Sequence, residues 1–159
     1  MTTIRPATPD DVPTILGFIR ELADYEREPD AVHATEASLL EALFGASPAA
    51  EAVIAEYDDA ARGFALFFHN FSTWTGKRGL YLEDIYVTPD ARGRGVGKAL
   101  LRHLAAIAVA RDCARFEWSV LDWNAPAIAF YDSVRADSMD GWTVRRVHGE
   151  ALRTLVGVA

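Results

Sequence analysis

Residues 79–111 constrain the fold of this chain more than any other stretch, because they join an apolar strand, a glycine-rich loop and an amphipathic helix. Leu80 to Val87 is almost entirely apolar, is rich in aromatic and β-branched residues, and ends at Thr88-Pro89-Asp90, which predicts a buried strand followed by a turn. An apolar stripe then predicts a helix of about seventeen residues that packs on a sheet; it comprises Val96, Leu100, Leu101, Leu104, Ile107 and Ala108. The combination is typical of an α/β protein.

The loop between strand and helix, Arg92-Gly93-Arg94-Gly95-Val96-Gly97-Lys98, predicts an anion site. Glycine reaches positive φ without strain, so successive backbone N–H groups can turn toward one anion. The unpaired amides and the dipole of the helix start point at the same place. Three cationic side chains add positive charge. The sequence therefore predicts a ligand that carries phosphates.

Two familiar phosphate motifs do not fit this loop. A P-loop requires Ser or Thr after its lysine, whereas Ala99 follows Lys98. A dinucleotide fingerprint requires a glycine three residues after Gly95, where Lys98 stands, and it normally follows the first strand of a βαβ unit. We therefore expect a different phosphate-bearing ligand.

Two adjacent carboxylates, Glu83 and Asp84, interrupt the apolar strand. Burying an ionised carboxylate is costly, so acids in a core strand need a partner or a function. One alternative is an ion pair with a core arginine. Successive strand residues face opposite sides unless a bulge intervenes, so we expect only one of the two to reach a ligand.

The pattern Arg92-x-x-Gly95-x-Gly97 behind YLEDIYV resembles the acetyl-CoA-binding signature of the GCN5-related N-acetyltransferases. The resemblance extends over nearly the whole chain. Within this family the chain is similar to the diamine acetyltransferase subfamily, and most closely to its branch acting on thialysine-like amino acids. The segments that carry it are IRPAT at the start, ELADYE at 21–26, FSTWTGK at 71–77, VLDWN at 120–124, AIAFY at 127–131 and DGW at 140–142.

This resemblance implies one N-acetyltransferase domain over residues 1–159, an α/β (α+β) fold with a mixed, mostly antiparallel sheet of six to seven strands and about four flanking helices. Two parallel strands, Leu80 to Val87 and Arg115 to Leu121, are expected to splay apart at the acetyl-CoA site. The other expected strands are Thr2 to Pro6, Ala52 to Glu56, Gly63 to Phe71 and Trp142 to His148. The first expected helix follows Thr8, which can cap it in a capping-box-like arrangement with Asp11. A second helix is expected at Glu36 to Phe44, with Thr35 as its cap. A short helix at Ala125 to Tyr131 and a helical turn at Glu150 to Leu155 complete the set.

The resemblance also implies the coenzyme contacts. Backbone N–H groups of residues 85–87 would hold the acetyl carbonyl oxygen, Asn124 would support the pantetheine arm, and Tyr131 would face the sulfur. The implied acetyl-CoA-binding residues are Ile85, Tyr86, Val87, Arg92, Gly93, Arg94, Gly95, Val96, Gly97, Lys98, Asn124, Ala125, Pro126, Ala127 and Tyr131. The family expects a glycine after the short helix, but Arg135 occupies that position.

Acetyl transfer to an amine needs a proton acceptor and a proton donor. Glu83, expected to be partly buried with a raised pKa, is the candidate acceptor, directly or through water; Asp84 can share the role or attract the substrate. Tyr131 can protonate the departing thiolate, although a helix aromatic that closes the core is the alternative. The implied amine-binding residues are Tyr25, Glu26, Trp74, Glu83 and Asp84. A solvated acidic helix end is the other interpretation of residues 25–26.

Three alternatives remain open for the substrate and for the class of protein. Ser72 stands where the polyamine-acting branch carries an acid, which favours a smaller, amino-acid-like amine over spermidine or spermine. A protein or peptide N-acetyltransferase and a non-catalytic acetyl-CoA sensor are further alternatives. Direct transfer in a ternary complex is expected, because Cys113 has no assigned base and makes a poor acyl carrier.

The composition of the chain limits the classes of partner that it is expected to bind. The 159 residues carry 16 basic and 23 acidic side chains, a net charge of −7, which disfavours binding to nucleic acid. The N-terminus lacks an apolar signal core and no stretch approaches a membrane span. The single cysteine fits a reducing cytoplasm, and the spacing of the four histidines predicts no metal site. The resemblance implies a homodimer.

Overall fold

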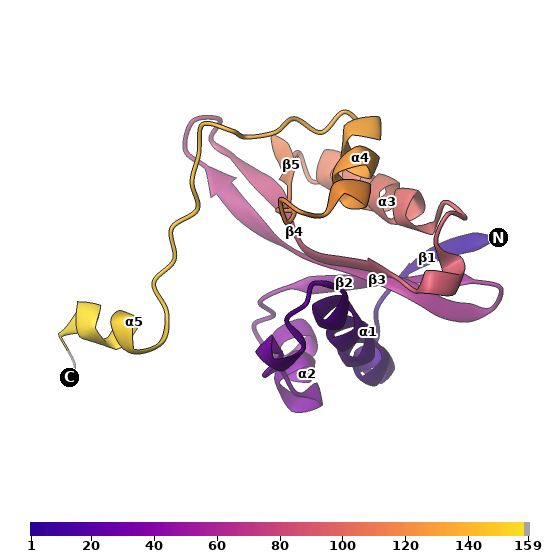
Figure 1. Ribbon diagram of the computed structural model, residues 1–159, viewed down its shortest axis with the longest axis horizontal. Helices are drawn as coiled ribbons and strands as arrows, with labels where there is room; N and C mark the ends of the chain where they lie inside the picture. Colours follow the sequence, from indigo (N-terminus) through magenta and orange to yellow (C-terminus); the bar gives the residue numbers. More distant parts are fainter. Residues whose placement is uncertain (158–159) are drawn as a thin grey trace. The chain divides into compact units, whose positions relative to one another are not determined.

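A five-stranded sheet organises the first 121 residues of the computed structural model, which describes residues 1–157 (Figure 1). Its order is β1-β2-β3-β4-β5, and its bounds are β1 (Thr2–Pro6), β2 (Glu51–Tyr57), β3 (Ala60–Ser72), β4 (Lys77–Val87) and β5 (Arg115–Glu117). All neighbours are antiparallel except β4 and β5, which are parallel because a helix carries the chain back between them. The mixed, mostly antiparallel α/β fold is confirmed.

The predicted number of strands was wrong, since five are present among residues 1–157 rather than six to seven. The strand expected at Arg115 to Leu121 ends at Glu117. The strand expected at Trp142 to His148 has no regular secondary structure, and Val144 within it is 82% exposed. A strand requires a partner for its backbone N–H and C=O groups, and side-chain alternation in the sequence does not supply one.

Three helices belong to the same unit: α1 (Val12–Tyr25), α2 (Glu36–Phe44) and α3 (Val96–Ala110). Figure 1 shows α1 and α2 on one face of the sheet and α3 on the opposite face. Phe18 of α1 packs against Phe64 and Tyr86, with ring centroids 5.8 and 5.9 Å apart, in the core under α1 and α2. Fully buried Leu100 and Leu104 of α3 lie in the helical stripe expected from the sequence.

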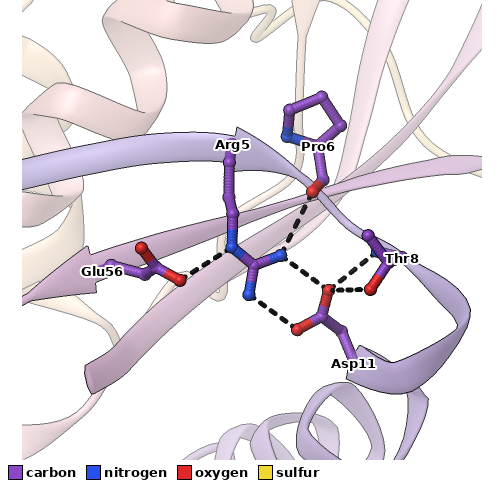
Figure 2. A network of polar contacts seen from close by, with 5 residues as sticks. All are labelled: Arg5, Pro6, Thr8, Asp11 and Glu56. Carbon is purple, nitrogen blue, oxygen red and sulfur yellow. Dashed lines mark hydrogen bonds and ion pairs between the residues drawn. The ribbon is translucent and has the colours of Figure 1, made fainter. Parts of the chain in front are cut away.

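The start of α1 is held by a network around Arg5 and Asp11 (Figure 2). Arg5 donates two hydrogen bonds to the Asp11 carboxylate, at 2.7 and 2.8 Å, and its Nε donates to Glu56 at 2.7 Å. Asp11 also accepts from the backbone N–H of Thr8, so the predicted capping box forms across the short helix η1 (Pro9–Asp11). Arg5 lowers the pKa of Asp11 to about 2. The network fixes β1 to the first helix.

Short-range sequence features define the start of α2 and the turn between β2 and β3. Thr35 caps α2 by accepting from the N–H of Ser38 at 3.1 Å, as predicted. The connection from β2 to β3 is shorter than the predicted six residues, because Asp58 and Asp59 both adopt positive φ, 51° and 58°. Two such residues close a tight hairpin whose twist matches the strands. Short helices η2 (Pro29–Ala31) and η3 (Pro89–Ala91) complete the unit.

A second unit begins at Asp122 and contains α4 (Ala125–Ser133) and α5 (Gly149–Val156). Both helices were predicted, with shorter bounds. Arg135 has φ 62°, so the position where a glycine was expected keeps the left-handed conformation that favours glycine. Across both units, no helix within residues 1–157 is long and apolar enough to span a membrane.

Candidate active site

The two acids of β4 are separated by a β-bulge at Glu83. Phe67 of β3 pairs with Leu82, and Leu66 pairs with Asp84, so Glu83 has no cross-strand partner in the register of these two strands. The bulge gives the adjacent carboxylates different surroundings: Glu83 is exposed and Asp84 is half-buried. The expectation that Glu83 is the partly buried acid was wrong, because the sequence does not reveal the register shift.

Asp84 is the acid whose ionisation the fold disfavours. Its pKa is raised to about 6, first by burial and then by the negative charges of Glu83 and Glu26. Burial also raises the pKa of Glu26, which follows the last residue of α1. Helix α1 thus brings Glu26 within electrostatic range of β4, and the three predicted acids form one negative cluster. Such a cluster attracts an ammonium group.

Tyr25, the last residue of α1, lies beside Arg92, the first residue of the predicted phosphate loop. The Arg92 guanidinium carbon lies 5.2 Å from the centroid of the Tyr25 ring and 5.6 Å from that of Tyr86. The end of α1, the end of β4 and the start of the predicted phosphate loop therefore meet at one point. Four of the five predicted amine-binding residues lie in this region: Tyr25, Glu26, Glu83 and Asp84.

Trp74 does not lie there. It occupies the turn between β3 and β4, is 89% exposed, and sits beyond Lys77, the first residue of β4. Seven residues of strand separate Lys77 from Asp84, which is roughly 23 Å. The expectation that Trp74 lies with the other amine-binding residues was wrong within one chain. Ser72, at the same end of the hairpin, is buried and accepts from the N–H of Thr75 at 3.3 Å.

The parallel pairing of β4 and β5 ends early. It covers three residue pairs, the last of which is Tyr81 with Glu117, while β4 continues to Val87. Within the described part of the chain, no strand pairs with this side of β4 from residue 82 onward. The strand pairing on this side of β4 thus stops at residue 81, which is consistent with the expected splaying.

The glycine loop has the geometry of an anion seat. Gly93 and Gly95 have φ values of 73° and 83°, and Gly95 is the N-cap of α3. A Cβ at either glycine would meet no other atom within 4 Å, so glycine is required for the backbone angle, and the space beside the loop is open. The first amides of α3 face this space without helical acceptors. This geometry is compatible with the anion site that the sequence predicts.

Two of the three cations predicted to contact the phosphates are held by protein groups. Arg92 Nε donates to the carbonyl of Val87 at 3.0 Å. Arg94 Nε donates to the carbonyl of Asp90 at 3.1 Å, and its guanidinium lies 5.6 Å from the Tyr57 ring centroid. Lys98 is exposed on the first turn of α3. The Nε atoms of Arg92 and Arg94 are therefore engaged within the loop itself.

The side-chain contact between Glu21 and Tyr86 was not predicted from the sequence. The Tyr86 hydroxyl donates to Glu21 Oε2 at 2.8 Å, which joins α1 to β4 beside the acid cluster. Burial and Glu21 together raise the pKa of Tyr86 to about 12. Helical spacing was the available signal, because residues 21 and 25 lie four apart on one face of α1.

The remaining predicted coenzyme residues lie in the second unit. Asn124 is buried and caps α4, its Oδ1 accepting from the N–H of Ala127 at 3.4 Å. Ala125 and Pro126 form the first turn of α4. Tyr131 lies on the same helix, with its ring 5.5 Å from that of Phe130. The roles given to these residues stay predictions.

No group of three or more His, Cys, Asp or Glu side chains among residues 1–157 could hold a metal ion. Cys113 is a free thiol, half-buried, with its Sγ 3.8 Å from Nδ1 of His69.

The sequence was compared with known proteins. The model of the Acetyltransferase (GNAT) family matches residues 16–135. A thialysine N-epsilon-acetyltransferase of Sus scrofa is 39% identical over 165 residues, covering 97% of this chain and 96% of that protein. A spermidine/spermine N(1)-acetyltransferase-like protein of Homo sapiens is 38% identical over 94% of this chain but 23% of its own length. An integron cassette protein from the mobile metagenome of V. cholerae has a TM-score of 0.81 at 28% identity, covering 98% and 97% of the two chains.

Proposed function

Because this chain belongs to the Acetyltransferase (GNAT) family, we propose that it acetylates the side-chain amine of a small thialysine- or lysine-like amino acid. The protein is an acetyl-CoA-dependent N-acetyltransferase. The proposed acceptor is supported by 39% identity over nearly the full length of a relative named for thialysine acetylation.

The acid cluster of Glu26, Glu83 and Asp84 is the structural observation that carries this proposal. A cationic amine that enters beside β4 meets three carboxylates, two of them with pKa values raised by burial. An ammonium group near them restores their preference for the charged form, so substrate and site stabilise each other.

We propose that Asp84 accepts the ammonium proton and that exposed Glu83 holds the incoming charge. A carboxylate with a pKa of about 6 is ionised at neutral pH and is a stronger base than an ordinary aspartate. Glu83, the acceptor expected from the sequence, remains the competing candidate. The pH dependence of kcat/KM separates them: the limb near pH 6 should persist in Glu83→Gln and disappear in Asp84→Asn.

Acetyl-CoA supplies a thioester-bound acetyl group when bound. We propose that the loop 92–98 and the first amides of α3 bind its diphosphate, and that backbone N–H groups within 85–87 stabilise the carbonyl oxygen as charge develops. In the second unit, Asn124 and residues 125–127 would border the pantetheine arm. The Tyr131 hydroxyl would donate its proton to the departing sulfur in a ternary complex.

A polyamine is the second candidate acceptor, and the human spermidine/spermine-like relative favours it. Ser72, which stands where the polyamine branch has an acid, is buried and bonded within its own turn, which weakens this candidate. A peptide N-acetyltransferase and a non-catalytic sensor have no comparable support. We also propose a homodimer in the cytoplasm without nucleic-acid partners, from the resemblance, the single cysteine and the net charge of −7.

The deciding experiment measures thiol release from acetyl-CoA with thialysine, lysine, ornithine, spermidine, spermine and a lysine peptide. The proposal expects the highest kcat/KM with thialysine or lysine. Faster turnover of spermidine would establish the polyamine candidate instead. Coenzyme binding without acetylation of any amine would favour the sensor.

A further inference from the structure

Arg92, the first residue of the predicted phosphate loop, has its side chain against two tyrosine rings. Its guanidinium carbon lies within 6 Å of two aromatic ring centroids, Tyr25 at the end of α1 and Tyr86 on β4. Its Nε donates a hydrogen bond to the carbonyl of Val87. This side chain is therefore turned toward the amine-binding region and is held there by three separate groups.

Tyr86 is fixed from the other side. It is 6% exposed, packs against Phe18, and donates its hydroxyl proton to Glu21 on α1. Because strand side chains alternate, Tyr86 and Asp84 lie on the same face of β4, two residues apart. The Glu21–Tyr86 bond thus sets the spacing between α1 and the strand beside the acid cluster.

These contacts form a continuous chain from the coenzyme seat to the amine site. Arg92 begins the loop whose glycines form the anion seat. It contacts Tyr25, which immediately precedes Glu26 of the acid cluster. It also contacts Tyr86, which Glu21 anchors.

We propose that Arg92, Tyr86 and Glu21 are positioning residues that join the start of the coenzyme loop to the amine-binding end of α1. This inference rests on the proposed function of that site. Neither Glu21 nor the Tyr86 hydroxyl belongs to the predicted amine-binding or coenzyme-binding groups. Their effect is expected on the amine, through the placement of Tyr25 and Glu26.

The first test separates positioning from charge on α1. Glu21→Ala removes the acceptor of the Tyr86 hydroxyl, whereas Glu21→Gln keeps an acceptor oxygen. Asp24→Ala removes an equal charge from the same helix without touching Tyr86 and is the matched control. We expect the KM for lysine or thialysine to rise about five- to tenfold in Glu21→Ala, with Glu21→Gln and Asp24→Ala within about twofold of wild type.

Coenzyme affinity and melting temperature are measured on the same variants. The proposal expects the Kd for coenzyme A and the melting temperature of Glu21→Ala to stay near the wild-type values. An amine KM that rises equally in Glu21→Ala and Asp24→Ala would overturn it, since the effect would then be net charge. An unchanged amine KM in Glu21→Ala would also overturn it.

Arg92→Lys provides the second test. Lysine keeps the charge toward a diphosphate but cannot lie flat against two rings. We expect its amine KM to rise by a larger factor than its Kd for coenzyme A. A Kd raised tenfold with an unchanged amine KM would show that Arg92 acts only as a phosphate ligand. Failure of the proposed function is distinguishable, because wild type itself would then release no thiol with any amine.

Discussion

Gly63 of β3 lies directly against the backbone carbonyl of Tyr86 on β4. A Cβ at residue 63 would come within 2.5 Å of that oxygen, closer than real Cβ contacts, and within 3.4 Å of the Cα of Val87. Gly63 pairs with Val87 in the β3–β4 register, so the contact concerns the end of β4 whose amides are proposed to bind the acetyl carbonyl. Close packing of two backbones, rather than a positive φ, requires glycine here.

Gly63→Ala is expected to destabilise the protein by about 2 kcal/mol, because the clash is with backbone and cannot be relieved by a rotamer change. Urea denaturation measures this change. Gly17→Ala is the control, since a Cβ at this α1 position meets nothing within 4 Å, and it should stabilise by about 0.5–1 kcal/mol. Equal effects of the two substitutions would contradict the argument.

Asp84→Asn should increase stability at high pH and lower activity. The folded-state pKa of Asp84, about 6, lies above its ordinary value of 3.8, so its contribution to stability is fully present below about pH 3.8 and is lost as pH rises through 6. Asparagine removes that loss. Denaturation at pH 8 should show the variant more stable by about 2 kcal/mol, and at pH 4 the difference should shrink. A difference that is independent of pH would show that Asp84 does not titrate in this range.

Gly95→Val should abolish coenzyme binding. The φ of 83° is strained for any side chain and worst for a β-branched one, and a valine would also project into the open space beside the loop. Isothermal titration with coenzyme A tests this result. Gly141→Val, at a glycine without positive φ in the second unit, is the control and should bind normally. Undiminished binding by Gly95→Val would refute the phosphate-seat assignment.

Tyr131→Phe should lower kcat about 10²-fold or more while leaving the Kd for coenzyme A nearly unchanged. Phenylalanine keeps the ring that lies beside Phe130 and removes only the proposed proton donor. Phe130→Leu is a comparison for packing on the same helix. Wild-type turnover by Tyr131→Phe would leave the ring with a packing role alone.

Arg135→Gly should stabilise the second unit by about 1 kcal/mol, because Arg135 holds a left-handed φ of 62° that costs a non-glycine residue free energy. Thermal denaturation measures the gain. Arg145→Gly, in the segment without regular structure, should produce no such gain. A loss of stability in Arg135→Gly would mean that the arginine side chain makes a compensating contact.

Features that depend on short spacings followed directly from the sequence. The glycine loop, the helix that it starts, the Thr8 and Thr35 caps and the bounds of α2 all rest on contacts between residues at most four apart. The left-handed position at residue 135 is also local, and it persisted with arginine in place of glycine. Local propensities and hydrogen bonds act before any long-range pairing, so these features could be predicted.

Only the tertiary structure decided which of the two acids is the less exposed and which of the predicted site residues lie together. The bulge at Glu83 depends on how β4 registers against β3, and the raised pKa of Asp84 depends in part on Glu26, which follows α1. The stacking of Arg92 joins residues 67 positions apart in sequence, and the hairpin length places Trp74 at the far end of β4. Such pairings are set by the packing of distant segments, because a shift of one residue in a strand exchanges every side chain between its two faces.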